Sequence, residues 1–500
     1  MKPIVNGLGK LKCGKRACAA FAVCVTTAIA VPAQTFTTLF SFDSTDGEYP
    51  SAGLVQATNG DLYGTTGYGG ANSNGTLFKI TPGGTLTTLY SFCSQTNCTD
   101  GAYPAYGLVQ HTNGDFYGTT LSGGGRNFGT VFKITPKGTL TTLYSFCPQS
   151  DCTDGSFPNG LVQATNGDLY GTTLFGGERD YGTVFKITPS GTLTSLYSFC
   201  PFDTSNGDHD SGCTNGFTPY GPLIQGTDGD FYGTTYGGGA YDLGTVFKIT
   251  PGGALTTLYS FCSQSGCTDG ESPEAGLVQA ADGDLYGTTV GGGVNGPYGT
   301  VFKITPGGRL TTLYSFCSQS GCTDGAMPDA VLVQATNGDF YGTTNTGGTN
   351  CASYDGCGTV FKITPSGVLT TLYSFCSQSG CTDGEDPAAG GLVQATSGDL
   401  YGTTVFGGAN NDGTVFSLPV GLGPFVETRP TSGLVGKAVE ILGSDLIGAT
   451  SVSFNGTAAT FTVVSHSLIT TTVPAGATTG TVQVVTPSGT LSSNVPFRVR

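Results

Sequence analysis

The sequence predicts an all-β protein: a seven-bladed β-propeller of four-stranded blades, closed by the N-terminal strand, followed by a small β-sandwich. Three observations indicate this fold. Glycine accounts for 83 of the 500 residues, but without the three-residue period of collagen. Short runs of Val, Thr, Tyr and Phe alternate with glycine-rich turns, a pattern typical of short strands. One set of these runs recurs seven times along the chain.

The first 33 residues have the composition of a secretory signal peptide. Five basic residues precede an apolar run at 17–30, and the small side chains of Val31 and Ala33 follow it. The run is too short to span a bilayer comfortably. We therefore expect cleavage after Ala33 and a secreted, extracellular or cell-surface protein without a transmembrane segment.

The charge balance argues against a nucleic-acid partner. The whole chain carries 19 Lys and Arg against 34 Asp and Glu. Loss of the five basic residues of the signal leaves 14 against 34, a formal charge of −20. Such a surface repels phosphate backbones. It either serves solubility outside the cell or attracts cations.

Four strings define the repeat. The most regular is "GDLYGTT" or "GDFYGTT"; "GLVQAT" precedes it, and "GTVFKITP" and then "TLTTLYSF" follow it. Each string has the length and side chains of one strand. The copies of the regular string begin at Gly60, Gly114, Gly167, Gly229, Gly283, Gly338 and Gly398.

The connections between the strings differ in kind. Asn-Gly in "ATNGDLY" and Pro-Gly-Gly in "ITPGGTLTT" predict tight turns. The other two connections, a glycine-rich loop and a cysteine-containing loop, are longer and variable. In an up-and-down blade the two tight turns share one face and the two variable loops share the other. We expect function on the variable face, since binding residues concentrate on loops held by a rigid scaffold.

The two ends of the array complement each other. The string "TTLFSF" at 37–42 is a fourth strand without a preceding three, and "GTVFSL" at 413–418 is a third strand without a fourth. The N-terminal strand is therefore expected to complete the last blade, giving seven complete blades.

With its four strings in this order, the array at about 36–418 resembles the GloVer tandem-repeat, or "choice-of-anchor", family of exported bacterial proteins. The resemblance implies export and a cell-envelope or extracellular setting. It implies no reaction and supplies no catalytic residues.

The repeat stops near Gly423, and a segment of about 75 residues follows in which β-runs alternate with Gly, Pro and Asn turns. This length and pattern suit a small β-sandwich. The strings "PTSG", "VSFNGTAA" and "VPAGATTGTVQVVTPSG" resemble the IPT/TIG immunoglobulin-like domain, which implies an Ig-like spacer or interaction module. The expected domains are a signal peptide at 1–33, the propeller at 34–419 and the Ig-like domain at 424–500.

Fourteen cysteines lie outside the signal, and their spacing predicts seven disulfides. Zinc binding would require CxxC-like spacing or histidine partners, which these cysteines lack. An even number in an exported chain favours disulfides. The expected pairs are Cys93–Cys98, Cys147–Cys152, Cys200–Cys213, Cys262–Cys267, Cys317–Cys322, Cys351–Cys357 and Cys376–Cys381.

Acidic residues in the cysteine loops have two interpretations. An Asp-Gly recurs after the loop at Asp46, Asp100, Asp154, Asp269, Asp324 and Asp383, with Asn215 in the fourth copy. It either forms an Asx-type turn into the next inner strand, which the asparagine favours, or a ring of carboxylates for cations. Asp203, Asp208 and Asp210 form either a solvated acidic loop or a weak calcium site without EF-hand spacing. No other cofactor is indicated.

Aromatic residues in the glycine-rich loops are the candidate ligand-binding residues. Stacked on sugar rings, they would bind a glycan; packed between neighbouring blades, they would be structural. The residues are Tyr68, Phe128, Tyr181, Tyr241, Tyr298 and Tyr354.

Three functions remain open. The favoured one is non-catalytic binding or scaffolding, with a glycan or protein ligand on the variable face. The second is a carbohydrate-active enzyme, a glycoside hydrolase or lyase, on the same face; no catalytic spacing is present, so no catalytic residues are assigned. The third is a purely structural surface protein. Non-repeated charged residues near the variable loops are Arg126, Glu178, Arg179, Asp180, Glu271, Glu274, Asp329, Glu385 and Asp386.

Overall fold

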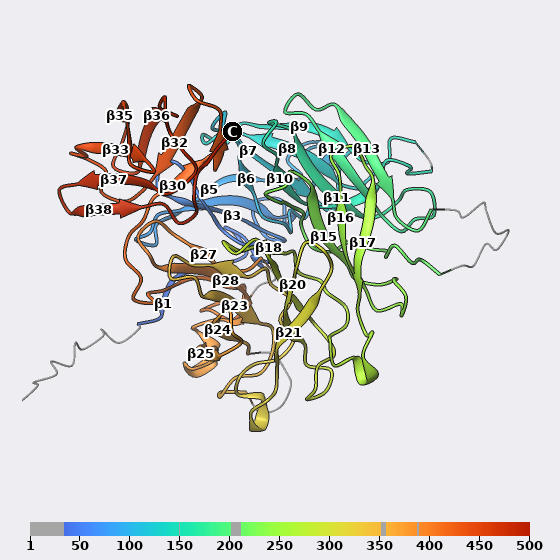
Figure 1. Ribbon diagram of the computed structural model, residues 1–500. Helices are drawn as coiled ribbons and strands as arrows, with labels where there is room; N and C mark the ends of the chain where they lie inside the picture. Colours follow the sequence, from blue (N-terminus) through green and yellow to red (C-terminus); the bar gives the residue numbers. More distant parts are fainter. Residues whose placement is uncertain (1–34, 150, 202–211, 352–356, 388–389) are drawn as a thin grey trace, which may run out of the picture. The chain divides into compact units, whose positions relative to one another are not determined.

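Each repeat folds into one antiparallel four-stranded sheet in the computed structural model, which describes residues 35–149, 151–201, 212–351, 357–387 and 390–500 (Figure 1). Sheets 1 to 6 consist of β2–β5, β6–β9, β10–β13, β14–β17, β18–β21 and β22–β25. Sheet 7 combines β27, β28 and β29 with β1 from the start of the array, and β26 also pairs with β28.

The first strand of each sheet comes from the "GLVQ" string and is mostly very short. These strands are β2 (Val55–Gln56), β6 (Val109–Gln110), β10 (Ser156–Gln163), β14 (Ile224–Gln225), β18 (Val278–Gln279), β22 (Val333–Gln334) and β27 (Val393–Gln394). β26 (Glu385–Pro387) precedes β27.

The second strand comes from the "LYGTT" string and has its five common residues fully buried, because it lies between neighbouring sheets on both sides. These strands are β3 (Leu62–Thr66), β7 (Phe116–Thr120), β11 (Leu169–Phe175), β15 (Phe231–Thr235), β19 (Leu285–Thr289), β23 (Phe340–Thr344) and β28 (Leu400–Phe406).

The third strand is buried except at its lysine, and the fourth is the most exposed. The third strands are β4 (Thr76–Ile80), β8 (Thr130–Ile134), β12 (Thr183–Ile187), β16 (Thr245–Ile249), β20 (Thr300–Ile304), β24 (Thr359–Ile363) and β29 (Thr414–Leu418). The fourth strands are β5 (Leu86–Ser91), β9 (Leu140–Ser145), β13 (Leu193–Ser198), β17 (Leu255–Ser260), β21 (Leu310–Ser315), β25 (Leu369–Ser374) and β1 (Thr37–Ser41).

Pairs of phenylalanines join each sheet to the next. The phenylalanine after a fourth strand packs against the third-strand phenylalanine of the following sheet, with ring centroids 5.2–5.3 Å apart. The pairs are Phe92–Phe132, Phe146–Phe185, Phe199–Phe247, Phe261–Phe302, Phe316–Phe361, Phe375–Phe416 and Phe42–Phe78. The last pair joins sheet 7 to sheet 1, so the first and last sheets are also neighbours.

The glutamine of the "LVQ" string forms a second set of contacts between sheets. Gln110 accepts a hydrogen bond from the backbone N–H of Thr58 in the preceding sheet (3.0 Å), and Gln56 accepts one from Thr396 of sheet 7 (2.9 Å). Matching contacts join sheets 3 to 4, 4 to 5, 5 to 6 and 6 to 7. The recurring glutamine thus satisfies turn amides that would otherwise lack partners.

The C-terminal segment forms a β-sandwich of two four-stranded sheets, β30-β32-β36-β35 and β34-β33-β37-β38, and a parallel pair β31-β39. Its core includes Val439, Ile441, Val452, Ile469 and Val484. The strands are β30 (Glu427–Arg429), β31 (Ser432–Gly433), β32 (Ala438–Leu442), β33 (Ser451–Phe454), β34 (Thr457–Ala459), β35 (Phe461–Val463), β36 (Leu468–Thr472), β37 (Val482–Thr486), β38 (Gly489–Ser492) and β39 (Arg498–Val499).

The sandwich packs against the tight turns of the repeat array, and the chain from residue 34 onward is one compact unit. Arg429 donates to the Gln56 carbonyl (2.9 Å) and to Gln110 Oε1 (3.0 Å). Ser467 donates to the Thr58 carbonyl (2.9 Å). We call the side of the tight turns the turn face, and the side of the two longer loops the variable face.

The described part of the chain contains seven disulfides, at the pairs Cys93–Cys98, Cys147–Cys152, Cys200–Cys213, Cys262–Cys267, Cys317–Cys322, Cys351–Cys357 and Cys376–Cys381. In four of the short loops a single 3₁₀ turn lies between the cysteines: η1 (Thr96–Cys98), η2 (Ser265–Cys267), η3 (Ser320–Cys322) and η4 (Ser379–Cys381).

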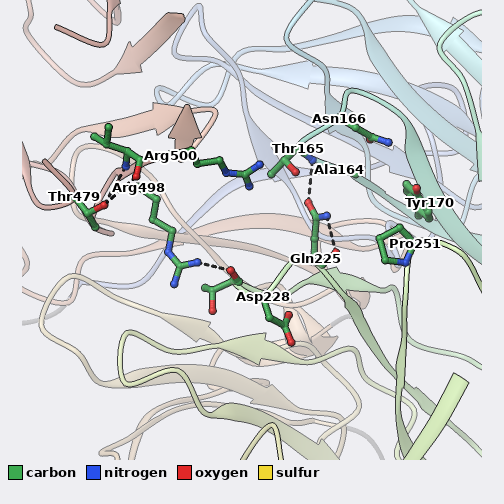
Figure 2. Close-up of a pocket in the computed structure, with 13 residues that line it drawn as sticks. Ala164, Thr165, Asn166, Tyr170, Gln225, Asp228, Pro251, Thr479, Arg498 and Arg500 are labelled. Atoms are coloured by element: carbon green, nitrogen blue, oxygen red, sulfur yellow. Dashed lines mark hydrogen bonds between the residues drawn. The ribbon is translucent and has the colours of Figure 1, made fainter. Parts of the chain in front are cut away.

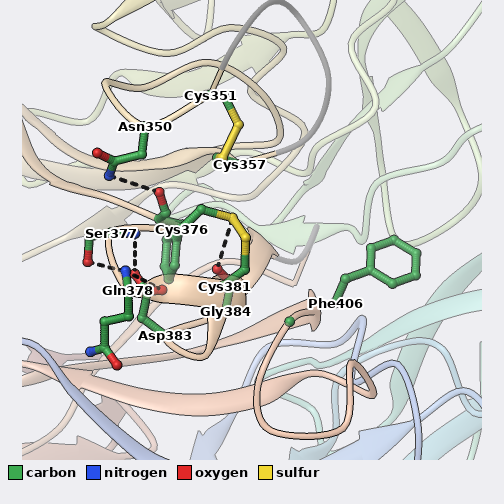
Figure 3. The surroundings of a disulfide bond; sticks show 12 residues. Asn350, Cys351, Cys357, Cys376, Ser377, Gln378, Cys381, Asp383, Gly384 and Phe406 are labelled. Carbon is green, nitrogen blue, oxygen red and sulfur yellow. Dashed lines mark hydrogen bonds between the residues drawn. A yellow bond between two sulfur atoms is a disulfide. The ribbon is translucent and has the colours of Figure 1, made fainter.

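The recurring aspartate holds the disulfide loop against the sheet (Figure 3). Asp383 is fully buried. It accepts hydrogen bonds from Tyr373 Oη (2.7 Å), from the N–H and hydroxyl of Ser377 (2.9 and 2.8 Å) and from the N–H of Gln378 (3.2 Å). All these donors precede Asp383 in the sequence. An Asx turn into the next strand would use a donor that follows the aspartate, so that expectation is wrong here. The carboxylate fixes the loop behind it.

The same aspartate contacts recur in other repeats. Asp100, Asp269 and Asp324 accept from the equivalent tyrosine, serine and glutamine. In the fourth repeat Asn215 donates to Tyr197 Oη (2.9 Å), which keeps the tyrosine contact with the donor and acceptor exchanged. These contacts favour the structural interpretation of the aspartates over a cation ring.

Replacing Asp383 by alanine is expected to lower the free energy of unfolding by about 2–3 kcal/mol, because it removes the hydrogen bonds that a buried carboxylate accepts from Tyr373, Ser377 and Gln378. Removing the adjacent disulfide as Cys376→Ser/Cys381→Ser should cost roughly 2 kcal/mol, since the closed loop is short. Guanidinium unfolding of both variants measures the difference.

Asp383→Asn is the matched control for this comparison. It should retain more stability than Asp383→Ala, because Asn215 already occupies the equivalent position. Equal losses for the asparagine and alanine variants would contradict the role assigned to the carboxylate.

Within the described ranges, no helix has the length and apolar character needed to cross a membrane. The expectation of an all-β chain built from tandem four-stranded sheets is confirmed.

Candidate functional site

Two segments from each sheet build the variable face. The first is the lead-in segment between the cysteine loop and the first strand; the second is the start of the loop after the second strand. Backbone bridges hold the two together, as at Glu48–Tyr68, Glu271–Gly291 and Glu385–Phe406. The recurring sheet therefore presents loop side chains at fixed positions.

One position of the lead-in segment, directly before its proline, has positive φ in every repeat. It is occupied by Tyr49, Tyr103, Phe157, Thr218, Ser272, Met327 and Asp386, with φ between 51° and 60°. Left-handed backbone is unfavourable for such residues and persists only where neighbouring contacts impose it. For Tyr103 these are bonds from its N–H to the Asn74 carbonyl (3.0 Å) and from the N–H of Leu121 to its own carbonyl (2.9 Å). The backbone is thus constant while the side chain varies from aromatic to acidic.

The lead-in segments of different sheets approach one another closely. A Cβ on Gly53 of sheet 1 would overlap the carbonyl oxygen of Gly390 of sheet 7. Only glycine permits this approach. Thr403 of sheet 7 donates to the Ala52 carbonyl of sheet 1 (3.1 Å), and Thr234 of sheet 4 donates to the Ala275 carbonyl of sheet 5 (2.8 Å). The first threonine of the "YGTT" string thus joins neighbouring lead-in segments.

Four aromatic rings form a continuous row across sheets 7, 1 and 2, which we call the aromatic arc: Phe406, Tyr49, Tyr68 and Tyr103. Their centroids are 5.2 Å apart for Phe406–Tyr49, 5.7 Å for Tyr49–Tyr68 and 4.9 Å for Tyr68–Tyr103. Tyr68 is 47% exposed and Phe406 is 37% exposed.

Three acidic residues from sheets 5, 6 and 7 interact electrostatically and form what we call the carboxyl cluster: Glu274, Asp329 and Asp386. Asp329 experiences the charges of both other residues. Its Oδ2 accepts a hydrogen bond from Asn345 (3.3 Å), whereas its Oδ1 is buried with no partner among the described residues. An enclosed carboxyl oxygen without a donor is unusual in a folded protein.

Two tyrosines from sheets 2 and 4 extend the cluster. Tyr106 and Tyr220 interact with each other and with Glu274. Tyr220 is 38% exposed, and its ring lies 5.9 Å from that of Tyr236. Side chains from five sheets therefore share one electrostatic environment.

Burial and neighbouring charges raise the pKa values of the cluster. Burial, together with the charges of Asp386 and Glu274, raises the pKa of Asp329 to about 7. Burial and the charge of Glu385 raise the pKa of Asp386 to about 6. Burial also raises the pKa of Glu274. Near neutral pH, part of the cluster is therefore protonated and can donate as well as accept hydrogen bonds.

The aromatic residues expected to bind a ligand divide into two groups. Tyr68 and Tyr241 are exposed, at 47% and 52%. Phe128, Tyr181 and Tyr298 are partly buried against core clusters, as expected for packing between sheets. Tyr354 lies outside the described residues, as do the calcium candidates Asp203, Asp208 and Asp210.

The non-repeated charged residues divide in the same way. Glu274, Asp329 and Asp386 come together, and Glu385 interacts with Asp386. Glu271 lies in the lead-in segment of sheet 5. The remaining residues lie in loops after second strands: Arg126, Glu178, Arg179 and Asp180. Asp180 caps its own loop by accepting from the N–H of Gly176 (2.7 Å).

Sequence reasoning missed Tyr49, Tyr103, Phe406, Tyr106 and Tyr220. The signal lay in the lead-in strings "GEYPSAG", "GAYPAYG" and "GFTPYG". In these strings the proline is constant and the residues next to it vary. The proline fixes the backbone, so the residues flanking it were the positions to compare.

Within the described ranges, the His, Cys, Asp and Glu groups close enough to share an ion are Cys262/Cys267/Glu271 and Cys376/Cys381/Glu385. Both contain disulfide-bonded cysteines. Since the thiolate is the metal ligand, neither group offers a metal site in this state.

These features describe a tandem-repeat β-sheet protein with one variable, chemically mixed face. Residues 25–211 and 208–416 match the Gloeobacter/Verrucomicrobia repeat, and residues 426–499 match the IPT/TIG domain. The chain belongs to the Gloeobacter/Verrucomicrobia repeat family and carries a C-terminal IPT/TIG domain. No curated protein matches it.

Solved structures share only distant similarity with the chain. A luciferin-regenerating enzyme is 11% identical, with 78% of this chain and 97% of that chain covered and a TM-score of 0.40. A puromycin hydrolase is 12% identical, with coverage of 72% and 50% and a TM-score of 0.43. A protein of unknown function from Dyadobacter fermentans DSM 18053 is 9% identical, with coverage of 78% and 99% and a TM-score of 0.40. Similarity at this level carries no argument about activity.

Proposed function

We propose that this protein is an exported, non-catalytic binding protein that holds a neutral glycan on its variable face. The observation that carries the proposal is the aromatic arc on sheets 7, 1 and 2, which meets the carboxyl cluster at sheet 7. Glu385, next to Asp386 of the cluster, is bridged to Phe406 of the arc. Aromatic faces beside a few polar groups are the usual lining of a site for an uncharged ligand with an apolar face.

The chemistry of the face favours a neutral glycan over an anionic one. Asp329 and Asp386 are partly protonated near neutral pH, so they can donate to and accept from sugar hydroxyls. The acidic surface of the protein repels polyanions. The rings of Tyr68 and Tyr103 offer flat surfaces on which a sugar ring can stack.

The same proposal includes the architecture: residues 34–419 form a closed seven-bladed β-propeller, and residues 424–500 form a separate Ig-like domain. It is supported by the seven sheets, by the pairing of β1 with β29, and by the Phe42–Phe78 contact between the last sheet and the first. Export is supported by the signal-like composition of residues 1–33 and by the seven disulfides, since disulfides persist in oxidising compartments.

Binding is tested with soluble neutral polysaccharides: laminarin, xyloglucan, galactomannan and dextran, measured by affinity electrophoresis and then by calorimetry. We expect at least one to bind, and Tyr68→Ala to weaken it by about tenfold, which corresponds to roughly 1.4 kcal/mol. The side chain removed is exposed, so the fold should be retained.

Val368→Ala is the control, since this side chain is 62% exposed in a tight turn on the opposite face. It should bind as the parent does. Absence of binding to every polysaccharide, or equal affinity of the Tyr68 and Val368 variants, would refute the proposal.

One observation favours a second candidate, a carbohydrate-active enzyme. Asp329 has a pKa of about 7 and lies beside Asp386, whose pKa is about 6. This difference resembles the division between a general acid and a carboxylate partner. Release of reducing ends or unsaturated sugars from a bound polysaccharide, lost in Asp329→Ala, would establish this function. Binding without release supports the non-catalytic one.

A further inference from the structure

A second recess lies on the turn face, between sheets 3 and 4 and the C-terminal domain (Figure 2). Its volume is about 680 Å³. The repeat array contributes Asn166, Asp228 and Pro251 from three tight turns, and the C-terminal domain contributes Arg498 and Arg500. Junctions between domains are common positions for ligand sites, and this volume is within the usual range.

The two arginines lie on the same side of the C-terminal strand because side chains two residues apart in a strand share a face. β39 pairs with β31, and the N–H of Arg500 donates to the Gly433 carbonyl (3.1 Å). Thr479 Oγ1 accepts from the N–H of Val499 (3.1 Å). The strand that carries the arginines is therefore anchored at several points.

The two guanidinium groups differ in the hydrogen bonds that they form within the protein. Arg498 Nη1 donates to the Thr227 carbonyl (2.5 Å), which leaves its other N–H groups facing the recess. The Arg500 guanidinium points toward Thr165 in Figure 2. Over the described residues, it has neither a hydrogen bond nor an ion pair. Both side chains are exposed.

The acidic group in the recess is already paired. Asp228 Oδ2 lies 3.0 Å from Lys248 Nζ and accepts a hydrogen bond from Tyr232 Oη (2.8 Å). Lys248 also pairs with Asp230 (2.7 Å), so one lysine is shared by two carboxylates. Arg498 and Arg500 therefore add two positive charges to a recess whose described lining has one side-chain carboxylate, Asp228.

The uncharged polar side chains of the recess can bind the hydroxyl groups of a ligand next to the arginines. Gln225 is held in place by the N–H of Thr165 (2.9 Å) and by the Gly229 carbonyl (3.0 Å). The side chains of Thr165, Thr227 and Asn166 surround it. A bidentate arginine contact recognises planar or tetrahedral oxyanions.

We propose that this recess binds a small anionic sugar, a mono- or disaccharide whose charge is carried by a carboxylate, sulfate or phosphate group. The arginines hold the oxyanion, and the threonine and asparagine side chains contact the ring hydroxyls. This site differs from the neutral-glycan site in face, in charge and in residues. Its ligand would contact both domains.

Calorimetry on the mature full-length protein tests the proposal. The probes are galacturonic acid, digalacturonic acid, galactose 6-sulfate and glucose 6-phosphate, with galactose and inorganic sulfate as comparators. We expect at least one anionic sugar to bind, with an affinity that falls as salt rises, and at least tenfold tighter than galactose and sulfate. The preferred sugar identifies which oxyanion is recognised.

Arg500→Ala should weaken this binding at least tenfold, and it removes no hydrogen bond or ion pair within the described residues. Lys437→Ala is the matched control, because it removes one exposed positive charge of the same domain outside the recess. Tyr68→Ala should leave this binding unchanged, which separates it from the neutral-glycan site. The proposal is overturned if no anionic sugar binds, if galactose or sulfate binds as tightly, or if Arg500→Ala and Lys437→Ala behave alike.

Discussion

Replacing Phe42 by alanine is expected to lower the free energy of unfolding by about 3–5 kcal/mol, the usual range for removing a buried phenylalanine. Phe42 is fully buried, and its ring lies 5.2 Å from that of Phe78. Its N–H donates to the Gly413 carbonyl (3.0 Å). The residue thus lies where the chain passes from β1 of sheet 7 into sheet 1, and β1 itself is held in sheet 7 by its non-covalent pairing with β29. Guanidinium unfolding, followed by circular dichroism, measures the loss.

Phe92→Ala is the matched variant. Its ring makes the equivalent contact with Phe132, but it follows β5, which a tight turn joins to its sheet neighbour β4, whereas β1 has no such connection to β29. We expect a similar loss of stability for both variants. Only Phe42→Ala should accelerate hydrogen exchange in β1, because that strand depends on its pairing with β29 and on Phe42.

Unchanged exchange in β1 of Phe42→Ala, or a stability no lower than that of the exposed-site variant Val368→Ala, would contradict this account of closure. Either result would mean that β1 stays paired with β29 without the phenylalanine contact.

The repeat could be predicted from the sequence because its strands are encoded locally. Each string has β-branched and aromatic side chains, and each tight turn has a glycine or proline with a defined role. The pairing of β1 with β29 also followed from the sequence, since one orphan string at each end could be matched. These inferences required only periodicity and the counting of strands.

The aromatic arc could not be predicted in the same way. Tyr49 and Tyr103 stand in lead-in segments that have neither strand periodicity nor a turn motif. Their rings meet Tyr68 only because backbone bridges such as Glu48–Tyr68 bring two variable segments together. Contacts of this kind depend on long-range geometry, which a local pattern does not encode.

The docking of the C-terminal domain was also beyond sequence reasoning. The domain was expected as a spacer or interaction module, and its contact with the array was not predicted: Arg429 and Ser467 donate to main-chain carbonyls of sheet 1. Backbone carbonyls have the same chemistry at every position, so no residue type in the turns marks the interface. The C-terminal domain thus partly covers the turn face.

Asp329 combines a raised pKa with a position in the carboxyl cluster, and therefore makes stability depend on pH. Its pKa is about 7 in the folded protein and 3.8 in an unperturbed aspartate. The folded state therefore binds this proton more tightly than the unfolded state does. The stabilisation is fully present below about pH 4 and is lost as pH rises through about 7.

Asp329→Asn is accordingly expected to be more stable than the parent at pH 8, by about 2–4 kcal/mol, and equal to it near pH 4. The amide has the shape of the protonated acid and does not titrate, so the penalty of burying a charge beside Glu274 and Asp386 is absent. Unfolding at a series of pH values measures the difference.

Asp151→Asn, which removes a charge from an exposed position, should leave the pH profile unchanged. A parallel profile for Asp329→Asn and the parent would mean that Asp329 is ionised in the folded protein across this range, and its hydrogen-bonding role toward sugar hydroxyls would have to be abandoned.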